Sequence, residues 1–127
     1  MRSPRDLPVT PLAQGAFLLA AGLWPAVFPD HFQRVCETSL DDGVVRVLGA
    51  AVAAIGATVG VGAARAPERR AWKWLGIGTS SILAAADAVF LTSKHWSWVY
   101  AVDGAINLAL VAGWLGERQR PVRALAR

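Results

Sequence analysis

Two carboxylates that stand inside apolar segments are the side chains best placed to do chemistry in this chain. Asp87 and Asp103 each interrupt a run of about membrane length, and Asn107 follows Asp103 by one helical turn. A charged side chain inside a bilayer costs roughly 2.5–3.5 kcal/mol on insertion scales, so by default it indicates a site. Two carboxylates in a low dielectric cannot both ionise cheaply: a cation neutralises them, or one of them keeps a proton. We therefore take both as candidate catalytic groups for proton transfer.

Other polar residues share these helix faces and are candidate ligand-binding residues: Arg46, Ser80, Tyr100 and Asn107. Tyr100 lies one turn before Asp103, and Arg46 opens an earlier apolar run and is the cation available to the carboxylates. One interpretation is a structural network in which Arg46 pairs with the carboxylates and fixes the helix register. A second is an outward-facing pocket that binds or transforms a small molecule, and a third is an interface with a partner subunit.

Four apolar runs must position these side chains. Hydrophobic residues make up 54% of the 127 residues and charged residues 17%, and the charges fall in clusters between the runs. A membrane helix needs about 20 apolar residues. The runs predict an all-α protein of one domain, an integral membrane up-and-down four-helix bundle, with helices at 12–28, 44–64, 72–92 and 96–115. Residues 29–43 are predicted to form a loop. For the first run a secretory signal peptide is the rival interpretation, but no cleavage site of small residues follows it.

The last two helices are predicted to form a hairpin that brings the acids together. A tight turn is expected at 93–95, with Asp87 about seven residues before it and Asp103 about eight residues after it. At about 1.5 Å per residue, both carboxylates lie roughly 10 Å below the end of the hairpin. Neighbouring helix axes are about 8–10 Å apart, so the two side chains are expected at one level and close to each other.

Small residues on one face of the second run predict close helix packing. They recur at Gly49, Ala53, Gly56, Gly60 and Ala64. Gly56 and Gly60 form a GxxxG pair, which lets a neighbouring backbone approach closely in lipid.

The distribution of positive charge predicts the orientation of the bundle. Of the 13 basic residues, all but Arg34, Arg46 and Lys94 flank the side that holds both termini and the loop between the second and third runs. Cytoplasmic segments of membrane proteins carry this excess, so both termini are predicted to be cytoplasmic. The net charge of +4 is explained by orientation and predicts no nucleic-acid partner. The tryptophans are expected in two interfacial belts, the inner with Trp72, Trp74 and Trp114 and the outer with Trp24, Trp96 and Trp98.

The residues that usually bind metals or cofactors are few. Cys36 is the single cysteine, so the chain can form no internal disulfide and has no CxxC motif. Cys36 and the two histidines, His31 and His95, match no zinc or haem spacing. No metal and no cofactor is predicted, and the histidines are expected in solvated loops.

Short segments spread over nearly the whole chain resemble a known family. These segments are Gly22–Pro25, Arg46–Gly49, Ala86–Asp87 and Tyr100–Ala105. They look like a group of small prokaryotic four-helix membrane proteins similar to the DoxX-like superfamily. The resemblance implies a bundle in the cytoplasmic membrane of a prokaryote. DoxX-type proteins are associated with quinone-linked oxidoreductase complexes, but no redox ligand in this sequence supports carrying that activity over.

The sequence therefore predicts a multi-pass membrane protein whose partner is the lipid bilayer. It is expected to bind a small apolar or lipid-like ligand, or to act as a subunit of a membrane complex. The alternative is a small membrane enzyme, an isomerase or cyclase or a protein associated with an oxidoreductase, that uses its carboxylates for proton transfer. Small sterol-type isomerases also place acids in a pocket between membrane helices, but this analogy of site design does not establish function.

Overall fold

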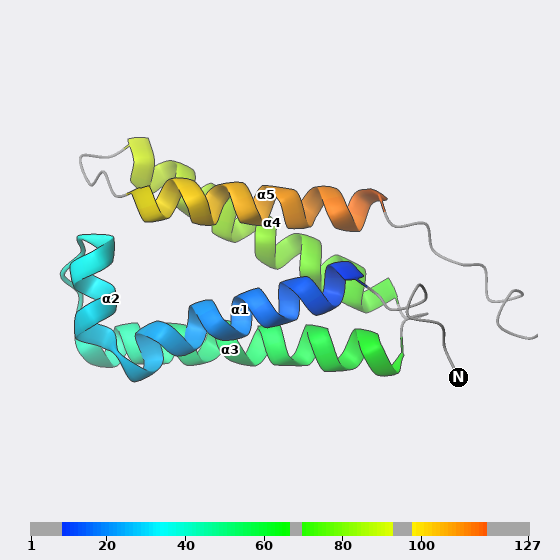
Figure 1. The fold of residues 1–127 in the computed structure, drawn as a ribbon, viewed down its shortest axis with the longest axis horizontal. Helices are drawn as coiled ribbons and strands as arrows, with labels where there is room; N and C mark the ends of the chain where they lie inside the picture. The colour runs from blue at the N-terminus through cyan, green and yellow to red at the C-terminus, as the bar shows by residue number, and fades with distance from the viewer. Residues whose placement is uncertain (1–8, 67–69, 93–97, 117–127) are drawn as a thin grey trace, which may run out of the picture.

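The computed structural model describes residues 9–66, 70–92 and 98–116, and every secondary-structure element in this part of the chain is a helix. The five helices are α1 (Val9–Val27), α2 (Pro29–Cys36), α3 (Asp42–Arg65), α4 (Arg70–Thr92) and α5 (Trp98–Gly116). The four long helices alternate in direction, so the start of α1 and the end of α5 lie at the same end of the molecule (Figure 1). By length and composition, α1, α3, α4 and α5 could each cross a membrane. The predicted all-helical class is confirmed.

The predicted helix boundaries are close to those observed. α1 begins three residues before the predicted start, with Pro11 in its first turn, where no helical N–H is needed. α3 begins at Asp42 behind Asp41, whose carboxylate accepts a hydrogen bond from the Val44 amide (3.2 Å) and caps the helix. The expected turn at 93–95 and residue Trp96 lie outside the described residues.

The prediction of a loop over 29–43 is wrong in its first half, where the chain forms α2. Pro29 opens this helix, Asp30 lies in its first turn and Arg34 in its last turn, an order that suits the helix dipole. Glu37 ends it with a left-handed backbone (φ 53°). Because α2 has eight residues and a largely polar composition, hydropathy does not reveal it.

α1 and α3 form one antiparallel pair with their backbones in close contact. Gly22 of α1 faces the backbone of Gly49 and Ala53, and Gly15 faces that of Gly56 and Gly60. A Cβ atom at Gly56 would lie 2.7 Å from the Cβ of Leu18, whereas one at Gly60 would lie 3.4 Å from the Gly15 Cα, an ordinary contact. The predicted small-residue face is confirmed over Gly49, Ala53, Gly56 and Gly60, which pack on α1, but Ala64 is exposed and Ala63 is buried in its place.

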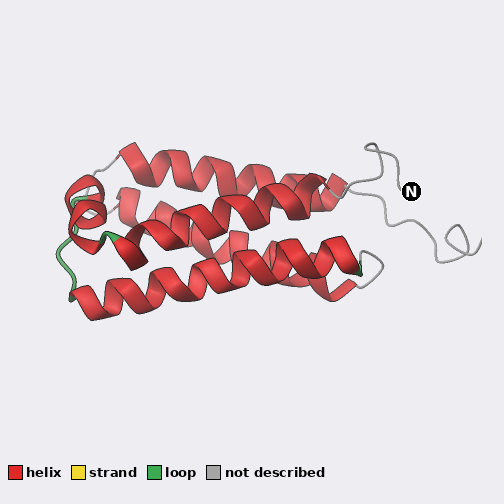
Figure 2. Cartoon of the chain, turned by 60° about the horizontal axis from the view of Figure 1, so that its bottom comes forward, coloured by secondary structure: helices red, strands yellow, loops and turns green. Residues whose placement is uncertain are grey.

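α4 and α5 form the second antiparallel pair, and the two pairs diverge along the molecule. Figure 1 shows α4 starting beside the α1–α3 pair and running obliquely until it lies next to α5. Within the described residues, α3 makes no contact with α5. α2 lies across the end where the pairs diverge and contacts α1, α3 and α5 (Figures 1 and 2).

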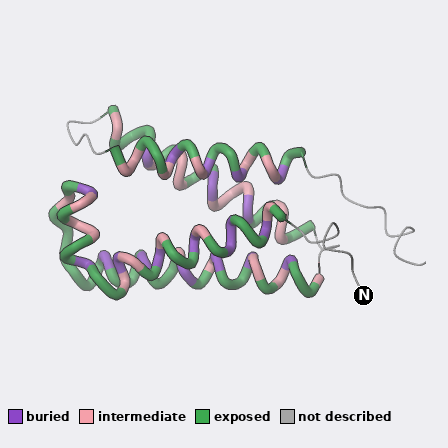
Figure 3. Tube along the Cα trace, viewed as in Figure 1, coloured by how far each residue is buried: buried purple, intermediate pink, exposed green. Residues whose placement is uncertain are grey.

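The outward faces of the long helices are apolar and exposed. Figure 3 shows buried positions along the inner faces and exposed ones around the outside. Ile82 and Leu108 are 71% and 62% exposed, and only 11% of the apolar span of α5 is buried inside the molecule. Soluble monomers rarely expose contiguous apolar surface on this scale. Exposed apolar faces of this kind are typical of interaction with a membrane or with another protein.

Candidate functional site

The two carboxylates singled out in the sequence meet between α4 and α5. The side chains of Asp87 and Asp103 are within hydrogen-bonding reach of each other. Asp87 is 6% exposed and Asp103 is half-buried. Gly104 lets α5 pack directly on the acid, since a Cβ atom there would lie 3.3 Å from the Cβ of Asp87. The predicted juxtaposition is thus present, and we call Asp87 and Asp103 the carboxyl pair.

Asn107 extends the site by one turn of α5. Its side chain is fully buried, and its Nδ2 donates a hydrogen bond to the Asp103 carbonyl oxygen (2.9 Å). Its Oδ1 and the Oδ2 of Asp87 are buried without a hydrogen-bond donor among the described residues. Leaving a buried acceptor unpaired costs about 1–3 kcal/mol, so native proteins rarely keep one without a role. The site offers two free acceptor atoms.

An aromatic stack lies toward the α2 end of the carboxyl pair. The rings of Tyr100 and Phe90 are stacked with centroids 5.0 Å apart and planes 23° from parallel. Tyr100 lies within electrostatic range of both Asp87 and Cys36. The predicted candidate Tyr100 is therefore beside the acids, and Phe90 is an apolar neighbour that the sequence interpretation missed.

α2 covers the carboxyl pair through its last residue, Cys36. The thiol is 1% exposed, and burial, with the nearby carboxylates of Asp103 and Asp87, raises the pKa of Cys36 to about 11. Since the thiolate is the reactive form, Cys36 stays a neutral and poorly nucleophilic thiol near pH 7. The prediction of a loop at Cys36 is wrong, because this residue ends α2. The spacing of Pro29, Phe32 and Cys36, three and four residues apart, was the available signal for a helix with a buried face.

The side chain of Arg46 binds the end of α1. Its Nη1 donates a hydrogen bond to the carbonyl oxygen of Ala26 (3.2 Å), and its side chain is exposed. The carbonyls in the last turn of α1 lack helical donors, and a cation there also suits the helix dipole. The described structure thus places Arg46 on the end of α1, and the network of Arg46 with the carboxylates stays a prediction.

Ser80 belongs to a second buried polar cluster, which links three helices. Gln14 of α1 donates from Nε2 to Ser80 Oγ and to the Gly76 carbonyl oxygen, each at 2.8 Å. Trp114 of α5 donates from Nε1 to the Gln14 Oε1 (2.7 Å). We call Gln14, Gly76, Ser80 and Trp114 the glutamine clamp. Since the amide of Gln14 is hydrogen-bonded at both ends and fully buried, the clamp is a structural link between α1 and the α4–α5 pair.

The clamp corrects two expectations. Ser80 lies seven residues before Asp87, about 10 Å along α4, so it is not part of the carboxyl site. Trp114 was expected at an interfacial belt, but it is 4% exposed because its indole N–H finds an amide acceptor in the core. Gln14 was missed, although an amide inside an otherwise apolar run was a signal that it needs a buried partner.

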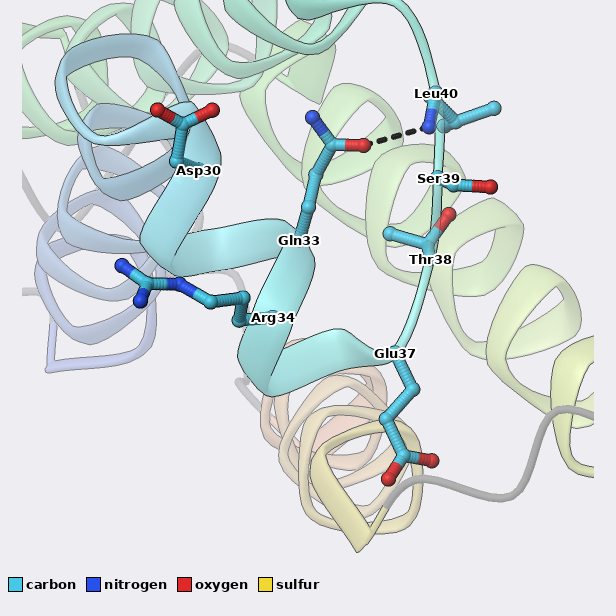
Figure 4. Close-up of a pocket in the computed structure, with 7 residues that line it drawn as sticks. All are labelled: Asp30, Gln33, Arg34, Glu37, Thr38, Ser39 and Leu40. Atoms are coloured by element: carbon cyan, nitrogen blue, oxygen red, sulfur yellow. Dashed lines mark hydrogen bonds between the residues drawn. The ribbon is translucent and has the colours of Figure 1, made fainter.

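A shallow polar hollow lies beside α2 (Figure 4). It measures about 470 Å³ and is lined by Asp30, Gln33, Arg34, Glu37, Thr38, Ser39 and Leu40. Gln33 accepts a hydrogen bond from the Leu40 amide (2.6 Å) and donates one to the Asp42 carboxylate (2.8 Å), so it fastens the loop to α2. None of the lining side chains is a buried polar group without a partner. We interpret the hollow as a solvated loop surface.

Among the described residues, no three His, Cys, Asp or Glu side chains are grouped to hold a metal ion. Comparison of the chain with known protein families, curated proteins and solved structures gives no match. The resemblance to DoxX-like proteins stays a prediction. The described residues form a helical protein with four apolar helices and a carboxyl pair in which Asp87 is buried and Asp103 half-buried.

Proposed function

We propose that this chain is a multi-pass protein of the cytoplasmic membrane of a prokaryote that binds a small apolar or lipid-like ligand at the carboxyl pair, alone or as a subunit of a membrane complex. The exposed apolar faces of the four long helices support the membrane location. The excess of basic residues on the side of the termini supports cytoplasmic ends.

The observation that carries the ligand site is the buried Asp87 with its unpaired Oδ2. A purely structural carboxylate inside the bundle is expected to have a cation or a full set of donors. Within the described residues Asp87 has neither, since its close polar neighbour is a second carboxyl group and Arg46 is bound to α1. The contact with Asp103 leaves Oδ2 of Asp87 unpaired, and a buried acceptor that costs folding energy and gains no donor is explained by binding.

The second candidate function is proton transfer in a small membrane enzyme. The contact between the two carboxyl groups favours it, because such a pair shares a proton that one member can give and the other can take. Asp87 and Asp103 are then the catalytic groups, and the apolar ligand is the substrate of an isomerase, a cyclase or an associated oxidoreductase.

The membrane orientation gives the first testable result. We expect reporter fusions after residue 127 to give a cytoplasmic signal and fusions at Ser39, in the α2–α3 loop, to give the opposite signal. The physical reason is the retention of basic segments on the cytoplasmic side during insertion. Equal signals at the two positions would contradict the topology, as would a mature chain that lacks α1.

Ligand access is tested with a hydrophobic carbodiimide, which dissolves in apolar phases and adds a protonated carboxyl group across its C=N bond. The resulting O-acylisourea rearranges to a stable N-acylurea, so the whole reagent mass stays on the protein. In membranes at neutral pH we expect one adduct on Asp87 or Asp103, measured by intact mass and peptide mapping. It should disappear in the double variant Asp87→Asn/Asp103→Asn.

The matched control is Asp30→Asn, which removes an exposed carboxylate of α2 and should leave labelling unchanged. If the folded protein does not react while the detergent-unfolded chain does, the pair is sealed. Ligand binding by the carboxyl pair would then be abandoned.

A further inference from the structure

The polar atoms around the carboxyl pair decide which chemical class of ligand it can hold. We infer that the bound group is a monovalent cation, either an alkali-metal ion or the ammonium head of an amphiphile. This inference rests on the proposed function, because it concerns the same site: an ammonium head would belong to the lipid-like ligand itself, and an alkali-metal ion would bind at the carboxyl pair beside that ligand.

The free polar atoms of the site are acceptors. Asn107 uses its Nδ2 on the Asp103 carbonyl oxygen, which fixes the orientation of the amide and leaves its Oδ1 as the open position. The open position of Asp87 is likewise an oxygen, Oδ2. A ligand that brings hydrogen-bond donors or positive charge satisfies atoms of this kind. An anion or an acceptor would add further unpaired oxygens to a buried space.

The charge around the pair calls for one positive charge. The titratable groups of the described chain that act on it, Cys36 and Tyr100, are neutral near pH 7, and Glu37 in their vicinity is acidic. When the two carboxyl groups share one proton, a single negative charge remains. Its electrostatic interaction with another charge is strong because the surrounding dielectric constant is low. One monovalent cation balances it, whereas divalent ions usually take more carboxylates and several waters.

The protein oxygens at the site are also chemically suited to bind a monovalent cation. Carboxylate and amide oxygens are hard donors, which suit alkali-metal ions and ammonium N–H groups rather than soft metals. Two acids and one amide form the set, which differs from the groups of three His, Cys, Asp or Glu that hold multivalent metals. Among the described residues, Cys36 of α2 and Tyr100 of α5 are the titratable neighbours of the pair.

Thermal unfolding of the full chain in an uncharged detergent tests the inference. The melting temperature is measured in sodium chloride against N-methylglucamine chloride at equal ionic strength, and separately with dodecylamine against dodecanol and dodecanoate. At a saturating concentration of the preferred cation we expect a rise of about 5 °C or more. Asp87→Asn keeps the side-chain shape and should lose the rise, whereas Asp30→Asn should keep it.

The outcomes distinguish a free ion from an amphiphile. They also distinguish failure of the cation inference from failure of ligand binding itself. A rise with sodium assigns the site to a free ion, and a rise with dodecylamine alone assigns it to an amphiphile; both support a monovalent cation. An equal rise with dodecanol, a rise with dodecanoate alone, or an undiminished rise in Asp87→Asn overturns it. Carbodiimide labelling without any cation response overturns this inference and leaves ligand binding standing. Absence of both overturns the proposed function as well.

Lys94 provides a further control, because it lies outside the described residues and near the sequence position where α4 ends. Lys94→Ala should respond to cations as the parent does. A response that appears only in Lys94→Ala would show that the chain supplies its own positive charge, and it would overturn the inference.

Discussion

Replacing Gly22 by alanine is expected to lower the free energy of unfolding by about 3 kcal/mol, at the upper end of overpacking costs. The added Cβ would overlap the backbone nitrogen of Ala53 and the backbone oxygen of Gly49. Neither atom belongs to a flexible side chain that can turn aside. α1 must therefore move away from α3, and contacts along the whole pair weaken. Unfolding of the purified protein by heat or by titration with a denaturing detergent measures the loss.

Two other glycines serve as matched controls for the same substitution. Gly60→Ala places its Cβ at an ordinary contact distance in the same helix pair and should cost little. Gly78→Ala meets no atom within 4 Å and should raise stability by about 0.5–1 kcal/mol through helix propensity. If Gly22→Ala unfolds like Gly78→Ala, the two backbones are not in contact and the packing described for α1 and α3 is wrong.

The strongest signals in the sequence concerned long apolar runs and small residues. Each long helix carries an apolar run of nearly its own length, so hydropathy alone located all four within three residues at either end. The face that joins Gly49, Ala53 and Gly56 was readable because helical periodicity puts these positions on one side. Asp87 and Asp103 could be matched in depth because a short turn fixes the register of a hairpin.

Side-chain contacts that depend on how the helices pack together could not be predicted from hydropathy and periodicity. Arg46 has a long side chain, and its sequence position does not show that the free carbonyls at the end of α1 are nearer than the carboxyl pair. Cys36 lies in a helix too short and too polar to produce a hydropathy signal. Gln14 and Trp114 are 100 residues apart, and no local sequence pattern predicts a hydrogen bond between them.

The second large effect is expected at the glutamine clamp. Gln14→Ala removes three hydrogen bonds and opens a cavity at a fully buried position. Hydrogen bonds between membrane helices contribute about 0.6 kcal/mol each on average, so the bonds account for about 2 kcal/mol. The lost side-chain volume adds to this, and we expect a total loss of about 3 kcal/mol in the free energy of unfolding, measured as for the Gly22 variant.

Apolar replacements at positions 14 and 114 distinguish the contribution of the Trp114 hydrogen bond from that of packing. Gln14→Leu fills most of the volume but leaves the indole N–H of Trp114 buried without an acceptor, which costs about 1–3 kcal/mol. Adding Trp114→Phe removes that donor, so the double variant should be more stable than Gln14→Leu alone. Equal stability of the two would contradict a role for the Trp114 hydrogen bond.

The clamp variants also test whether the two polar clusters are independent. Ser80→Ala removes one acceptor of Gln14 about 10 Å along α4 from Asp87, without touching the carboxyl pair. Sites this far apart with no shared partner usually contribute additively. Ser80→Ala should therefore lower the melting temperature and still react with the hydrophobic carbodiimide at the parent rate. Loss of that reaction in a folded Ser80→Ala variant would show that the clamp sets the geometry of the carboxyl pair.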